Sequence, residues 1–266
     1  MTNNDKSIGE RVLKIALAVF SFLVLFFLFL PILVVIPMSF SSASALEFPP
    51  PGFSFRWYQA LFSDKNWMEA MRNSFIIAAV SSTLALILGA LAAYGLVRSG
   101  NRFVGILESN FIAPLIVPPV VTGVALYIVF GYVGLLGTFG GLIIGHTVLA
   151  VPYVILVMVV AVRAFDYRIE QVAYSMGASW VTIARRIMLP NILPSLLAAW
   201  LFAFITSFDE VIVTWFVSGA IPTIPKKMFN ELIIEINPTI TAIASLLIIF
   251  STIGVWIFAT LMNRKE

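Results

Sequence analysis

The chain has 266 residues, of which 61% are hydrophobic and only 11% charged, so it carries too little polar surface to coat a soluble globule. The formal net charge of +3 comes from basic residues in short connections between apolar segments, which indicates membrane topology and no role in binding RNA or DNA. Because there is no cysteine, the sequence excludes disulfides, thiolate metal sites and cysteine nucleophiles.

Six apolar segments are long enough to cross a membrane. A helix needs about 20 apolar residues to span a hydrocarbon core of about 30 Å. A membrane β-barrel would instead need segments of about ten residues with alternating polarity, whereas the first segment is apolar on every face. The sequence therefore predicts an all-α fold, with residues 1–266 forming a single transmembrane domain. The spans are predicted at 13–38, 74–97, 109–133, 139–162, 195–217 and 239–262.

The first span follows three basic residues and precedes a stretch of small residues at 43–45 that resembles a signal-peptide cleavage site. Its apolar run, from Ile15 to Met38, is longer than the roughly 7 to 15 residues of a signal sequence. We therefore expect an uncleaved first helix, and a cleaved signal is the alternative.

Lys and Arg predict the orientation. With the N-terminus inside the cell, 11 of the 16 basic residues lie in cytoplasmic segments and 5 outside, which favours two cytoplasmic termini. The five outer residues are Arg56, Lys65, Arg72, Lys226 and Lys227.

Two connections are long enough to hold structure. The outer one, 39–73, contains a proline-rich turn followed by an aromatic-rich stretch, and we expect short helices at the membrane interface. The cytoplasmic one, 163–194, is predicted to form helices at 169–176 and 180–188, with Gly177 at the joint. Pro190 is expected to stop helix before the fifth span, as is Pro194. Two arginines in this loop, Arg185 and Arg186, could instead extend to lipid headgroups.

This loop resembles a known signature. Gly177 is followed, after nine residues, by Ile187-Met188-Leu189-Pro190. The spacing is similar to that of the Glu-Ala-Ala loop of permease subunits in binding-protein-dependent ABC importers. Where the family has Glu-Ala-Ala, this chain has Gln171-Val172-Ala173, so only Ala173 matches, and Glu170 lies one position earlier.

The resemblance extends over residues 55 to 260 and is closest to the second permease subunit of polyamine-type importers. The stretches that carry it are Asn73-Ser74, Pro114 to Pro119 with Gly123, Ser207 to Val211, and Phe216 to Gly219. It implies the type I ABC importer permease architecture and a loop that docks on a cytoplasmic ATPase. The residues implied for that coupling loop are Glu170, Gln171, Ala173, Gly177, Ile187, Leu189 and Pro190.

The chain has no phosphate-binding loop of its own, since no G-x-x-x-x-G-K-[ST] motif occurs and none of the six lysines follows a glycine. The chain is therefore expected not to be an enzyme and to hold no cofactor, with ATP and magnesium bound by the partner. The resemblance implies a bacterial inner-membrane complex with two ATPase copies, an external substrate-binding protein and a second permease. That permease could be identical, although the polyamine-type resemblance favours a different one.

Among 13 acidic residues, only Asp209 and Glu210 lie inside a predicted span. A charge there costs about 2.5 to 3.5 kcal/mol, so it should serve a purpose. It either accepts a structural hydrogen bond or lines a pathway for a cation, to which Phe208 and Trp215 could add cation–π attraction. A helical stripe shared with Thr206 and Val213 favours Asp209 as the pathway residue. Polyamines, quaternary ammonium compounds and basic opines all remain candidate substrates.

His146 is the sole histidine, and we expect it to be a satisfied or an interfacial side chain rather than a proton relay or a metal ligand. Two other functions are weighed. An intramembrane serine protease could use Ser218 with His146, but Phe216 stands where such a site would have glycine. A stand-alone secondary transporter is disfavoured because the two halves show no evident inverted repeat.

Overall fold

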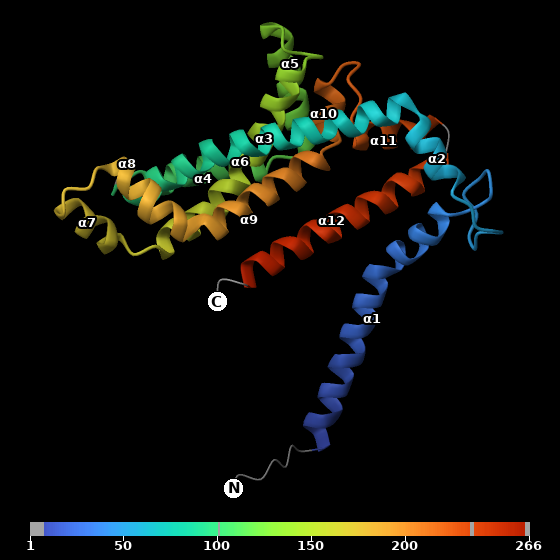
Figure 1. Ribbon diagram of the computed structural model, residues 1–266, viewed down its shortest axis with the longest axis horizontal. Coiled ribbons are helices and arrows are strands. Elements are labelled where there is room, and N and C mark those ends of the chain that lie inside the picture. The colour runs from blue at the N-terminus through green and yellow to red at the C-terminus, as the bar shows by residue number, and fades with distance from the viewer. Residues whose placement is uncertain (1–7, 101, 235–236, 264–266) are drawn as a thin grey trace. The chain divides into compact units, whose positions relative to one another are not determined.

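The computed structural model describes residues 8–100, 102–234 and 237–263, and the regular secondary structure in these ranges is helical apart from one antiparallel bridge between Ser41 and Phe53 (Figure 1). Five helices in these ranges are long and apolar enough to cross a membrane. They run over Gly9–Ser39, Lys65–Arg98, Phe139–Ala164, Trp180–Phe208 and Thr239–Trp256. A bent pair, Val104–Leu115 and Pro119–Val133, makes a sixth span if it is counted as one. The predicted all-α fold is confirmed, and the six predicted spans are matched when the bent pair counts as one span.

The third span was expected over 109–133 as a helix kinked by Pro114, Pro118 and Pro119, and the structure bends it far more sharply than a kink. It consists of α4 (Val104–Ile112), the short 3₁₀ turn η1 (Ala113–Leu115) and α5 (Pro119–Val133), with a bend of 95°. Pro119 begins α5, and Pro118 before it adopts φ −55° and ψ 134°, which is extended backbone. A residue that precedes proline is pushed out of the helical region, so the adjacent prolines account for the break.

Among the described residues, those from 8 to 64 form one compact unit with the described part of Glu231–Ile257. It contains α1 (Ile8–Ser39), α2 (Arg56–Ser63) and most of α12 (Thr239–Asn263). The Tyr58 hydroxyl of α2 hydrogen bonds with Ser39 at 2.8 Å and with Ser245 at 2.6 Å, so one tyrosine links the three helices. The presence of α2 confirms a short helix in the outer connection, whereas the residues from Lys65 onward already belong to the next long helix.

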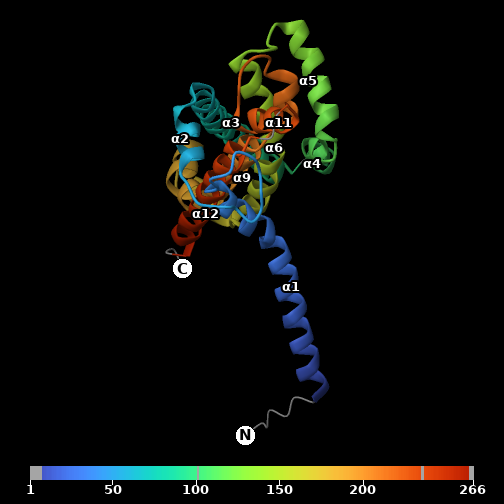
Figure 2. The ribbon, with the colours of Figure 1, turned by 90° about the vertical axis from the view of Figure 1, so that its right-hand side faces the viewer.

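The other unit is built on α3 (Lys65–Arg98), α6 (Phe139–Ala164) and α9 (Leu189–Phe208), which pack against one another. Small residues at the contact let the helices approach closely, as is usual in membrane proteins. The fully buried ones include Ala85, Ala93, Ala150, Ala199 and Ala203. At one end of these helices lie α7 (Tyr167–Ser175) and α8 (Trp180–Ile183), and at the other α5 packs against α10 (Ile212–Val217) (Figures 1 and 2).

The prediction that Pro190 stops the helix is wrong. A π-helical segment, η2 (Ala184–Met188), joins α8 to α9, and Trp180–Phe208 runs as one 29-residue helix with Pro194 inside it. Proline lacks an N–H and collides with the carbonyl four residues before it in a regular helix. The wider π turn just before Pro190 changes that spacing, which lets the helix continue. The remaining helix, α11, spans Ile224–Ile234.

Candidate functional site

The segment between α6 and α9 is a tight helix-turn-helix. Gly177 has φ +83°, and its N–H donates to Tyr174 O at 2.9 Å while Ala178 N–H donates to Ala173 O at 3.0 Å. This pattern closes the end of α7 through a left-handed glycine, which confirms the expected turn. The next helix, α8, begins with a side-chain cap, in which Ser179 Oγ accepts from Thr182 N at 3.3 Å.

One carboxylate of this segment points inward. Glu170 is 1% exposed, and its Oε1 lies 2.7 Å from Arg98 Nη2 and 3.0 Å from Arg98 Nε, at the end of α3. Tyr94 donates its hydroxyl proton to Glu170 Oε2 at 3.0 Å, and Trp180 Nε1 donates to the Tyr94 oxygen at 3.3 Å. We call Glu170, Arg98 and Tyr94 the Glu170 cluster. Since a buried charge needs a partner, this cluster fixes α7 and α8 to α3.

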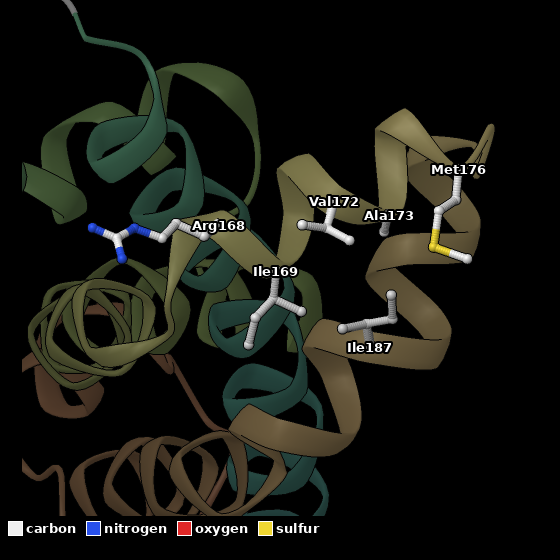
Figure 3. A pocket seen from close by; sticks show the side chains of 6 residues that line it. All are labelled: Arg168, Ile169, Val172, Ala173, Met176 and Ile187. Carbon is white, nitrogen blue, oxygen red and sulfur yellow. The ribbon is translucent and has the colours of Figure 1, made fainter.

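The outer face of the segment has an apolar hollow. Figure 3 shows Ile169 and Val172 on α7 with Ile187 of η2 facing them across the hollow, whose volume is about 330 Å³. Its six lining residues are Arg168, Ile169, Val172, Ala173, Met176 and Ile187. Met176 is 83% exposed, so an apolar side chain stands in the open at the rim. An exposed apolar patch on a polar loop is typical of a surface that binds another protein.

The predicted coupling residues divide between these two faces. Ala173 and Ile187 line the hollow, while Gln171 is exposed beside it and Glu170 is buried in its cluster. Leu189 is the first residue of α9 and exposed, and Pro190 follows it. The structure thus brings five of the seven into α7, its closing turn and the hollow, and places the other two in the helix that follows.

The acidic pair lies between two helices. After α9 ends at Phe208, residues 209–211 are outside helix before α10 begins at Ile212. We call residues 209–211 the break. A helical stripe through Thr206, Asp209 and Val213 was expected, and this prediction is wrong because the helix does not continue through these positions. Hydropathy cannot detect such an interruption, since the residues on both sides are equally apolar.

The two carboxylates of the break have different surroundings. Glu210 Oε1 accepts from Val213 N at 2.8 Å and so satisfies an N–H in the first turn of α10. Asp209 is exposed, and within the parts of the chain that the structure describes its carboxylate makes neither a hydrogen bond nor an ion pair. The Glu210 carboxylate therefore has a structural contact, whereas the Asp209 carboxylate is free to contact a passing group.

The two aromatic residues predicted beside the pair are engaged in packing. Phe208 stacks on Phe204 with 5.5 Å between ring centroids, and Trp200 extends the stack at 5.3 Å. Trp215 meets Phe229 edge to face at 4.5 Å. Cation–π attraction by Phe208 or Trp215 stays a prediction.

His146 is 2% exposed, and its ring nitrogens contact Ser207 and Thr214, which confirms a satisfied buried histidine. Ser218 is fully buried and instead accepts from Lys226 Nζ at 2.6 Å. Burial also lowers the pKa of Lys226. The serine and histidine that a protease would pair are thus engaged elsewhere. No group of three metal-ligating side chains gathers among the described residues.

Residues 85–266 match the family described as binding-protein-dependent transport system inner membrane component. The chain belongs to this family. It is 32% identical over 248 residues to the spermidine/putrescine transport system permease protein PotC of Haemophilus influenzae, covering 93% of this chain and 96% of that protein. The putrescine transport system permease protein PotI of Escherichia coli is 36% identical over 253 residues, or 90% and 88%. In fold, a bacterial ABC transporter involved in the import of alginate is similar, with a TM-score of 0.74 and 19% identity over 98% of this chain and 99% of that one.

As a permease of this family, the chain is the non-catalytic membrane component of an ABC importer, working with an external binding protein and with a partner ATPase that binds ATP. The matched region contains both the α7–α8 segment and the break. Sequence reasoning missed Arg98 and Tyr94, the partners of Glu170. A signal existed, because Arg98 directly follows the predicted span 74–97 on the cytoplasmic side, where Glu170 was also predicted to lie.

Proposed function

We propose that this permease forms half of the inner-membrane pathway of a polyamine importer, with Asp209 as a pathway residue. The observation that carries the proposal is the exposed, unpaired Asp209 carboxylate at the break in a span of a chain whose relatives are named for spermidine and putrescine transport. Backbone that leaves the helix inside a membrane protein is tolerated where it lines a cavity or lies against protein. A break of this kind in a permease is therefore a suitable place for a pathway wall.

The chemistry fits an amine cation. An ammonium group that enters a narrow pathway loses part of its hydration, and a fixed carboxylate offsets that cost most where water is scarce. Asp209 supplies this charge, whereas Glu210 is engaged in holding α10. The neighbouring Phe208 and Trp215 contribute aromatic surface for the methylene segments or cation–π attraction for the amines.

The hollow is proposed to receive the ATPase. It is apolar, exposed and about 330 Å³ in volume, large enough for an apolar side chain of a partner. The Glu170 cluster ties the same helix-turn-helix to α3, and the continuous Trp180–Phe208 helix ties it to the break. A movement imposed on the loop by ATPase closure can thus reach Asp209 through one rigid helix. Gln171, at the family's glutamate position, is exposed and available to the ATPase surface.

The assembly is proposed to contain a second, non-identical permease, two ATPase copies and a periplasmic binding protein. Six spans make half of a pathway, and the resemblance to polyamine systems favours a different second subunit. The 11 to 5 distribution of basic residues supports cytoplasmic N- and C-termini, which puts the α7–α8 segment on the ATPase side.

The test is uptake by a bacterial strain without polyamine importers of its own that carries the complete set of transport genes. Radiolabelled spermidine and putrescine should enter only when this chain is present, and a hundredfold excess of unlabelled polyamine should compete. Choline, a basic opine and molybdate serve as comparison solutes. Saturable uptake of choline or the opine with no polyamine uptake would reassign the substrate, and uptake of the anion alone would reject a cation pathway.

A further inference from the structure

One histidine contacts both sides of the break. His146, on α6, places Nδ1 2.8 Å from Ser207 Oγ in the last turn of α9. Its Nε2 lies 2.9 Å from Thr214 Oγ1 in α10. The two contacted residues are the nearest polar side chains of the helices that flank residues 209–211. A single imidazole on a third helix therefore bridges the interruption.

The contacts form a connected chain of hydrogen bonds across the break. Thr214 Oγ1 donates its one proton to the carbonyl of Glu210 at 2.8 Å. On the other side of the ring, His146 Nδ1 lies within hydrogen-bond distance of the Ser207 hydroxyl and, at 3.1 Å, of the Ser207 carbonyl oxygen. The imidazole thus contacts both the side chain and the backbone at the end of α9, and through Thr214 the chain of contacts ends on the Glu210 carbonyl of the break itself.

The small helix after the break needs such support. With six residues, α10 is far shorter than a helix that is stable alone, so tertiary contacts must hold it. Its buried side chains Val213 and Val217 pack near Phe130 of α5, and the Glu210 carboxylate covers one N–H. Within the described residues, the contact with His146 is the one side-chain hydrogen bond that joins α10 to the three-helix core.

We propose that His146 is a positioning residue that locks the α9–α10 break through Ser207 and Thr214, and thereby sets where Asp209 stands in the pathway. The lock itself follows from the geometry around His146. Its effect on transport rests on the proposed role of Asp209, and the two parts are tested separately.

The absence of cysteine from the chain makes a direct measurement possible. Val213 is fully buried in α10, and Val213→Cys gives a single small reporter that is protected while the break is locked. The purified transporter complex is treated with a water-soluble thiol reagent, and modification of this chain is followed by intact mass. Modification requires local opening, so its rate reports how often α10 leaves its place.

His146→Leu should raise the modification rate at position 213 more than about fivefold, the factor that corresponds to one lost hydrogen bond. Ser207→Ala removes one end of the chain and should raise it less, while His146→Gln, whose amide can donate and accept, should restore part of the protection. The matched control is Thr147→Val, because Thr147 is buried on the same helix but bonds only to the Ile143 carbonyl.

A second reporter separates a local lock from general loosening. Ala85 is fully buried in the α3, α6 and α9 core, and Ala85→Cys should stay protected in the His146 variants. Equal rates at position 213 in His146→Leu and Thr147→Val, or a parallel rise at position 85, would overturn the lock. If His146→Leu does not assemble, Ser207→Ala decides in the same way.

Uptake tests the link to Asp209. If His146 acts by placing Asp209, the losses caused by His146→Leu and by Asp209→Asn should not multiply in the double variant. Independent, multiplying losses would reject the link. The modification assay needs no substrate, so a wrong substrate assignment and a wrong lock give different results.

Discussion

Asp209 and Glu210 are neighbours in the chain, yet only one has a fixed partner. Asp209→Asn removes the charge and keeps the shape, so we expect uptake of a polyamine to fall at least about tenfold, with assembly unchanged. Glu210→Gln should be milder, because its amide oxygen can still accept from Val213 N. Radiolabelled uptake and tag purification of the complex, carried out on both variants, provide the measurement.

The pair of variants also separates two roles for Asp209. An asparagine can replace a carboxylate that only accepts hydrogen bonds. Wild-type uptake by Asp209→Asn would therefore reject the electrostatic role, and a variant that fails to assemble would assign Asp209 to the structure.

Glu170 is predicted to hold the helix-turn-helix rather than to face solvent. Glu170→Ala leaves Arg98 mostly buried without its counter-charge, a change that costs about 3 to 5 kcal/mol for buried pairs. We expect a lower melting temperature of the complex, faster proteolysis within α7 and weaker coupling of ATP hydrolysis to uptake. The control is Gln171→Ala, since Gln171 is the exposed neighbour on the same helix.

A double variant sharpens the comparison. Replacing both partners by apolar residues, Arg98→Met with Glu170→Leu, removes the stranded charge and should be less destabilising than Glu170→Ala alone. A double variant that melts no higher than Glu170→Ala would show that the pair is not what holds the segment.

At the scale of helices, the joint at Gly177 gives a test of conformation alone. Its φ of +83° is unfavourable for a side chain, although the space around an added Cβ is open. Gly177→Val should therefore cost about 1 kcal/mol or more, and reduce ATPase docking or its coupling to uptake. Gly177→Asn, which tolerates the left-handed region, should lie between valine and wild type. Co-purified ATPase and stimulated ATP hydrolysis measure the effect, and full activity of Gly177→Val would show that the turn is not required.

The turn at Gly177 could be predicted because a glycine between two helix-forming stretches is a local signal. The spans could be predicted because they depend on the mean hydropathy of about 20 consecutive residues. Two interruptions were not predicted. The bend at Pro118 was expected only as a kink, and the break after Phe208 carries no proline or glycine at all. The helix across Pro190 was not predicted because a proline normally ends a helix, whereas here the π turn just before it accommodates the proline ring. The contact of Glu170 with Arg98 joins residues 72 apart, and spacing in sequence does not reveal such pairs.

At the scale of the whole molecule, the hollow on α7 should decide whether the ATPase stays bound. Val172→Glu introduces a charge into its apolar lining and should greatly reduce the amount of ATPase that co-purifies through a tag on this chain in mild detergent. Val181→Glu is the matched control, because Val181 is a similarly exposed valine on α8 that does not line the hollow. Equal loss of ATPase in the two variants would mean that the hollow is not the docking surface, and no ATPase with the wild-type chain would contradict the complex itself.

The π turn before α9 determines how the residues before it are rotated about the helix axis relative to the residues after it. Each residue advances a regular helix by about 100°, so the extra residue held in a π turn rotates everything before it relative to everything after it. The π turn therefore sets the rotation, about the helix axis, of the side chains of α8 relative to the α9 face that packs on α3 and α6. Deleting one residue from Ala184–Met188 would leave composition and hydropathy almost unchanged and yet turn the hollow by roughly a quarter of a circle. A single helical turn therefore determines the direction in which the hollow faces, in addition to the chemistry of its lining.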